Sequence, residues 1–162
     1  MLLILKPYFS HLPSDPRTLL KNQTDQVVKC LKRGGEYCYL GFATGLRKLL
    51  HTFCLALHDV TNIFELQFNI DGLPLFKSSC TKLWPTLCLV KNLKITDPLV
   101  VSLYCTTEKP SSASEYVQDF IYEMNELPGN SLLFDDKRFG IKIHSFVCDA
   151  PAIAFLKCIK GH

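Results

Sequence analysis

The chain has 162 residues, of which 48% are hydrophobic and 20% are charged, so it is long enough for one domain and too apolar for a disordered segment. Its formal net charge is only +3, whereas a strong nucleic-acid binder usually has a steeper imbalance or a clustered basic patch. The apolar start of the sequence, Met1–Leu5, is too short for the core of a signal peptide, and no apolar run is long enough to span a membrane. We therefore expect an intracellular protein with no membrane partner.

Residues 1–60 are predicted to form a helical lead-in. Prolines and paired glycines interrupt its first half, where a short helix is expected over Gln26–Lys32. A second helix is predicted over Thr44–Leu57, because its apolar residues recur at helical spacing. The residues that share this apolar face are Leu46, Leu49, Leu50, Phe53, Cys54 and Leu57.

Three β-strands are predicted to follow the second helix. Ile63–Ile70 alternates between apolar and polar residues, which is typical of a strand with one buried face. Asp71 comes directly after this strand, on the polar side of the alternation. The second and third strands are predicted at Leu83–Val90 and Leu99–Cys105, where apolar and β-branched residues predominate.

A capping signal precedes the next predicted helix. Ser112 and Glu115 have the S-x-x-E spacing of a capping box, and the helix behind them is expected to end before Pro128. A last helix is predicted over Ala152–Ile159, because Pro151 is suited to a first helical turn.

A fourth strand is predicted between these two helices, over Phe139–Asp149. Unbroken alternation would place Ile141, Ile143 and Val147 on one side of this strand. Asp149 would then end the strand on that same side.

The order of elements is therefore helix, three strands, helix, strand and helix. Three consecutive strands followed by a crossover helix predict an α/β fold with a mixed sheet, antiparallel first and parallel after the helix. We place this predicted domain at residues 61–162.

Two aspartates stand at the ends of predicted strands, Asp71 and Asp149. If those strands are neighbours in the sheet, the two carboxylates meet at one of its edges. Paired carboxylates bind Mg²⁺ or Mn²⁺ and can take part in two-metal phosphoryl transfer. The alternative is that each aspartate is a turn residue, which is common where Asp precedes Gly at the end of a strand.

Four short motifs occur in an order that carries a resemblance. They are Phe68–Ser79, which contains Asn69-Ile70-Asp71-Gly72, then Trp84-Pro85, then Cys148–Ala152, and finally Lys160-Gly161-His162. Together they resemble the core of transposase-like proteins in animal genomes, which are similar to CACTA-type (En/Spm) DDE transposases. The resemblance covers about residues 12–162.

This resemblance implies a ribonuclease-H-like catalytic core that is incomplete in this chain. Asp71 and Asp149 match the first two acids of that core, which uses Mg²⁺ or Mn²⁺ to cleave and transfer DNA strands. In the family a third acid completes the site, and the tripeptide ending at His162 leads into a zinc-binding C-x-x-C. The resemblance therefore implies DNA as a partner and the nucleus as the location.

The third acid has no counterpart in this sequence. The glutamates of the helix before Asp149 stand in the wrong order for it; they are Glu115, Glu123 and Glu126. We therefore expect a transposase-derived protein, ancestrally a metal-dependent enzyme, that is inactive on its own.

The alternative is a co-opted module that binds DNA or protein without catalysis. Its candidate phosphate contacts are Lys29, Lys32, Arg33, Arg47 and Lys48, which are equally consistent with a solvated face. Trp84 and Tyr104 are candidates for stacking on bases, with core packing as the favoured interpretation. A third interpretation is a reading frame without a stable product.

The eight cysteines form no C-x-x-C pair, so the sequence contains no complete zinc ribbon and the thiols are interpreted as reduced. His144 and Cys148 would lie about 13 Å apart along a strand that rises about 3.3 Å per residue, too far for a Cys–His nucleophile pair. Asp135 and Asp136 are interpreted as residues of a solvated loop rather than metal ligands.

Overall fold

The computed structural model describes residues 27–31, 34–52, 62–75, 80–93, 96–107 and 112–158. The strands are β1 (Val28–Cys30), β2 (Glu36–Tyr39), β3 (Ile63–Ile70), β4 (Leu73–Pro74), β5 (Lys82–Val90), β6 (Leu99–Thr106), β7 (Ser131–Phe134) and β8 (Lys137–Cys148). The helices are α3 (Phe42–Thr52), α4 (Ala113–Glu126) and α5 (Ala150–Leu156), with a short 3₁₀ turn, η2 (Pro128–Asn130).

The strands of this part of the chain form one mixed sheet in the order β1-β2-β6-β5-β3-β8-β7, and β4 pairs with β5 outside that path. β3, β5 and β6 are antiparallel neighbours, whereas β8 returns after α4 to lie parallel to β3. The predicted α/β class and the change from antiparallel to parallel pairing are thus confirmed.

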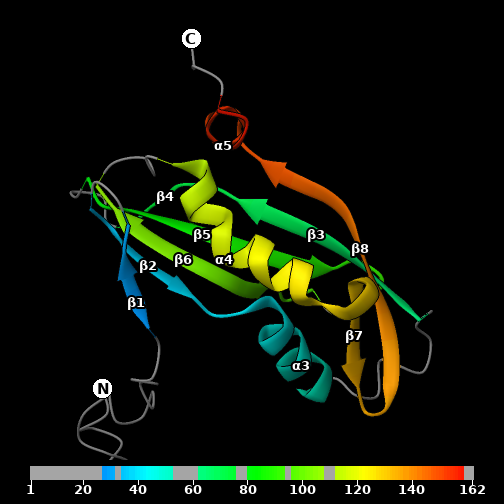
Figure 1. The fold of residues 1–162 in the computed structure, drawn as a ribbon. Coiled ribbons are helices and arrows are strands. Elements are labelled where there is room, and N and C mark those ends of the chain that lie inside the picture. Colours follow the sequence, from blue (N-terminus) through cyan, green and yellow to red (C-terminus); the bar gives the residue numbers. More distant parts are fainter. Residues whose placement is uncertain are drawn as a thin grey trace, which may run out of the picture.

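The core lies between the helices and one face of the sheet, and Figure 1 shows α4 running across this face. Phe64, Leu66 and Phe68 of β3 are fully buried there, together with Leu46 of α3. A second buried cluster lies at the end of the sheet where β3 and β8 finish. It contains Tyr37, Ile70, Trp84, Tyr104, Tyr116 and Ala152. The alternation predicted for Ile63–Ile70 therefore identifies the buried face of β3 correctly.

The prediction of a helix over Gln26–Lys32 is wrong. Val28–Cys30 is a strand that pairs antiparallel with β2, and Lys29 stands opposite Tyr37. Pairing with a partner strand therefore outweighs the weak local preference of this segment. The division of the chain at residue 60 stays a prediction, and described residues on both sides of it share the one sheet.

Two other boundaries differ from the prediction. α3 begins at Phe42, two residues early, and the predicted end at Leu57 lies outside the described residues, as does Ile159 at the end of the last helix. Asp135 and Asp136 form the two-residue turn of the β7–β8 hairpin, with φ of 47° and 60°. Asp tolerates this left-handed conformation, which matches the twist of a hairpin.

Glu123 of α4 joins the two large helices and β2. Its carboxylate accepts the backbone N–H groups of Phe42 at 2.7 Å and Ala43 at 3.1 Å, at the start of α3. It also accepts the hydroxyl of Tyr39, and burial together with this hydrogen bond holds the pKa of Tyr39 well above its usual range. Because α3 has no acidic residue in its own first turn, Glu123 supplies the N-terminal cap from another helix.

We expect Glu123→Ala to lower the free energy of unfolding by about 2 kcal/mol, because it leaves half-buried N–H groups and a hydroxyl without their charged acceptor. Glu126→Ala, at an exposed position of the same helix, should change it by less than about 0.5 kcal/mol. Urea denaturation of both variants measures the difference. Equal losses would contradict the capping role.

Candidate functional site

The two predicted acids follow adjacent strand ends. β3 and β8 are parallel neighbours, and the last pair in their register is Ile70 opposite Cys148. Asp71 and Asp149 directly follow these two strands. The acid pair was predicted on the condition that the two strands are neighbours, and the structure shows that they are. Figure 1 shows the ends of β3 and β8 at the same side of the sheet, with α5 beyond them.

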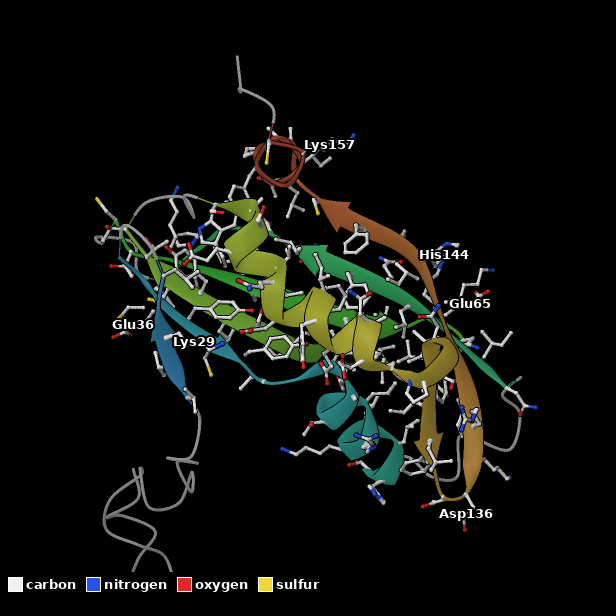
Figure 2. All side chains as sticks on the ribbon, in the orientation of Figure 1. Lys29, Glu36, Glu65, Asp136, His144 and Lys157 are labelled. Carbon is white, nitrogen blue, oxygen red and sulfur yellow. The ribbon has the colours of Figure 1, made fainter. Side chains whose placement is uncertain are left out.

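The register of this pair contains one extra residue in β8. Leu66 pairs with Ile143, but the next residue of β3, Gln67, pairs with Ser145. His144 is therefore a β-bulge, a feature that re-aims the side chains that follow it. Figure 2 labels His144 on β8, near Glu65 of β3.

The bulge changes which side chains of β8 face the core. Beyond it, Phe146 stacks on Phe68 with ring centroids 5.3 Å apart, so Phe146 takes a core-facing position. Val147 pairs with Asn69 on the opposite face, and the Asn69 amide donates to the carbonyl of Val147 at 3.1 Å. The prediction that Val147 shares a side with Ile141 and Ile143 is therefore wrong.

The prediction that Asp149 lies on the same face of the sheet as Ile141 and Ile143 is corrected in the same way. An unbroken strand would put Asp149 on the core face with Ile141 and Ile143, away from Asp71. Because the bulge absorbs one residue, alternation instead continues from the Asn69–Val147 pair to Asp71 and Asp149 together. Asp149 still has an extended backbone, with φ of −69° and ψ of 167°.

Each carboxylate has one oxygen held by the backbone. Oδ1 of Asp71 accepts the N–H of Gly72 at 2.7 Å, and Oδ1 of Asp149 accepts the N–H of Ala152 at 2.7 Å as the N-cap of α5. Among the described residues, neither Oδ2 has a hydrogen bond. The arrangement therefore orients both carboxylates, and no described residue occupies the second oxygen of either one.

Cys148 directly precedes Asp149 and pairs with Ile70, the residue before Asp71. Burial raises the pKa of its thiol, the backbone of Ile70 lowers it, and the negative charges of Asp149 and Asp71 raise it further. The thiol therefore stays protonated at neutral pH. A neutral thiol is a poor nucleophile, which agrees with the exclusion of a Cys–His pair.

Trp84 fixes the turn that follows Asp71. A Cβ added to Gly72 would lie 2.8 Å from the indole ring of Trp84, so only glycine fits here. Trp84 and Tyr104 are each 2% exposed, and Tyr104 donates to the carbonyl of Gly34 at 2.9 Å. Both aromatic side chains are core residues, which leaves neither available to stack on a base.

No third ligand joins the two aspartates within the part of the chain that the structure describes, where no group of three or more His, Cys, Asp or Glu could hold a metal ion. Glu123 caps α3, and the motif ending at His162 lies outside the described residues. The binding of Mg²⁺ or Mn²⁺ stays a prediction that depends on two acids.

The candidate phosphate contacts are scattered over the structure. Lys29 forms an ion pair with Asp119 of α4 at 2.9 Å. Arg47 and Lys48 are exposed on α3, while residues 32–33 lie outside the described ranges. The candidates that the structure describes therefore form no basic cluster beside the two aspartates.

Comparison of the chain with family models, curated proteins and solved structures gives no match. None of the helices in the described ranges is long and apolar enough to cross a membrane. The geometry of the strand ends and the resemblance of the motifs therefore remain the grounds for a function.

The position of the bulge predicts a contrast between two single-residue deletions in β8. Deleting His144 should leave every later pair with β3 intact, so the free energy of unfolding should change by less than about 1 kcal/mol. Deleting Val147 should place Cys148 opposite Asn69, on the other face of the sheet, and shift the Asp149 cap of α5, at a cost of about 3 kcal/mol.

Chemical denaturation of the two deletion variants measures this contrast. Equal losses, or a larger loss for the His144 deletion, would show that the extra residue lies elsewhere.

Proposed function

We propose that this chain is part of a ribonuclease-H-like core of DDE-transposase type, in which Asp71 and Asp149 bind a divalent metal ion. The observation that carries the proposal is the parallel β3–β8 pair, whose register ends on Ile70 and Cys148 directly before the two acids. The sheet order β6-β5-β3-β8, with antiparallel and then parallel pairing, supports it. The motifs around Asp71 and Asp149 support it independently of the fold.

The chemistry of the two acids suits Mg²⁺ or Mn²⁺. These hard cations prefer carboxylate oxygens, and they bind through one or two carboxylates while water and phosphate complete the shell. The Oδ2 atoms of Asp71 and Asp149 would supply the protein ligands, each oriented by the backbone bond of its Oδ1. A phosphodiester of DNA, bound in the nucleus, would be the ancestral substrate at such a metal.

Two carboxylates hold a metal less firmly than the three of a complete core. The described residues add no third acid, so we propose metal binding without turnover for this chain by itself. The ancestral activity is DNA strand cleavage and transfer.

A second candidate function is a module that binds DNA or protein without a metal. The observation that favours it is that each aspartate already has a structural role, Asp149 as the cap of α5 and Asp71 in the turn before Gly72. In that case both acids would serve the fold alone.

Titration with Mn²⁺ distinguishes the two candidates. At a Mn²⁺ concentration tenfold above Kd, binding should add about 1.4 kcal/mol of stability and raise Tm by about 4 °C. Asp149→Asn should abolish this rise while keeping the helix cap, because Asn caps helices as well as Asp does. Asp136→Asn, in the β7–β8 turn, is the matched control and should keep the full rise. No rise in the native chain, or an unchanged rise in Asp149→Asn, favours the metal-free module.

A plasmid-nicking assay with Mn²⁺ tests the expected lack of turnover. The native chain should nick DNA no faster than Asp71→Ala, because the described residues provide only two of the three acids. Nicking by the native chain that disappears in Asp71→Ala would overturn the proposal of inactivity.

A further inference from the structure

A cavity of about 480 Å³ lies between α4, α5 and the core face of the strand ends. Its walls are mostly apolar side chains from these three parts of the fold. They include Val117 and Ile121 of α4, Ile153 and Leu156 of α5, and Ile70 and Phe146 of the sheet. The volume is typical of a small-molecule site, and apolar cavities of this kind bind apolar ligands.

Three large apolar side chains of the wall remain half exposed. Ile121 is 50% exposed, Phe146 is 49% exposed and Ile153 is 42% exposed. Each comes from a different element, so together they border the cavity on three sides. A ligand with an apolar body would cover them and remove this surface from water.

The buried end of the cavity contains hydroxyl groups that satisfy one another. Tyr116 donates to the carbonyl of Trp84 at 3.3 Å, and the hydroxyl of Thr86 lies 2.9 Å from that of Tyr116. Since the Tyr116 proton is used, Thr86 is the donor of this pair. Burial raises the pKa of Tyr116 to about 12, so the phenol is neutral. The buried end therefore needs no charged group from a ligand.

Among the described residues, Lys157 is the one charged residue that lines the cavity, and no carboxylate lines it. It follows α5 directly, and Figure 2 labels it at the end of that helix. Ile153 and Leu156 of the same helix contribute apolar wall beside it. The site thus combines an apolar interior with a single positive charge at an exposed position.

We propose that this cavity binds an amphipathic monocarboxylate, a molecule with an apolar chain and an anionic head. The chain would lie among Val117, Ile121 and Ile153, and the carboxylate would pair with Lys157. Asp71 and Asp149 do not line the cavity, so this proposal is independent of metal binding. A second copy of the chain, or an apolar helix of another protein, is the competing occupant.

Decanoate, used below its micelle-forming concentration, is the probe. Trp84 is the only tryptophan of the sequence, it shares a buried cluster with Tyr116, and its carbonyl accepts the Tyr116 hydroxyl, so we use its fluorescence as the reporter of binding. Decanoate should change this fluorescence saturably while the protein stays monomeric in sedimentation. Decyltrimethylammonium, which has the same chain length and the opposite charge, should bind more weakly.

Two charge-reversal variants form a matched pair. Lys157→Glu should weaken decanoate binding about fivefold and strengthen decyltrimethylammonium binding, since an exposed charge pair is worth up to about 1 kcal/mol. Lys48→Glu makes the same charge change on the exposed side of α3 and should alter neither affinity. Both positions are exposed, so both variants should fold like the native chain.

Val117→Phe fills the cavity and should reduce binding of both probes at least about tenfold, with its fold verified by circular dichroism. The proposal is overturned if decanoate binding does not saturate, if Lys157→Glu binds it as the native chain does, or if Val117→Phe leaves its affinity unchanged. Concentration-dependent dimers that Val117→Phe disrupts would assign the cavity to a second copy instead.

Discussion

The parallel pairing of β3 with β8, including the extra residue at His144, is the constraint on which the rest of the structure depends. It joins β7 and β8 to the rest of the sheet. It also determines toward which face of the sheet each side chain of β8 after Ile143 points. Because a shift of one residue moves all later side chains to the other face, the bulge decides what Phe146 and Cys148 contact. The stacking of Phe146 on Phe68, with centroids 5.3 Å apart, stabilises this register.

The same strand ends serve two different environments. Ile70 and Cys148 line the apolar cavity, and the residues directly after them, Asp71 and Asp149, begin the turn and the helix that follow the strands. Alternation separates the two environments by a single residue. A change in the β3–β8 register would therefore alter the cavity and the acid pair at once.

Much of the fold could be predicted from local pattern. Strict alternation over Ile63–Ile70 located β3 with its correct bounds, and the Ser112–Glu115 spacing located the N-cap of α4, where Ser112 accepts the N–H of Glu115 at 3.2 Å. The bulge could not be predicted, because Val147 continues the alternation of Ile141 and Ile143 as well as Phe146 and Cys148 continue it with one residue inserted. The short strand at Val28–Cys30 depends on its partner strand, and the cavity depends on how α4 and α5 pack. The metal role of the acids stays a prediction.

We propose that the carboxylates of Asp71 and Asp149 converge beyond the β3–β8 pair and share one divalent ion. Anomalous diffraction from crystals soaked in Mn²⁺ measures this most directly. We expect one anomalous peak within bonding distance of an oxygen of each aspartate, at roughly 2.0–2.2 Å as for small hard cations. Ordered carboxylates on opposite faces of the sheet, with no peak between them, would contradict it.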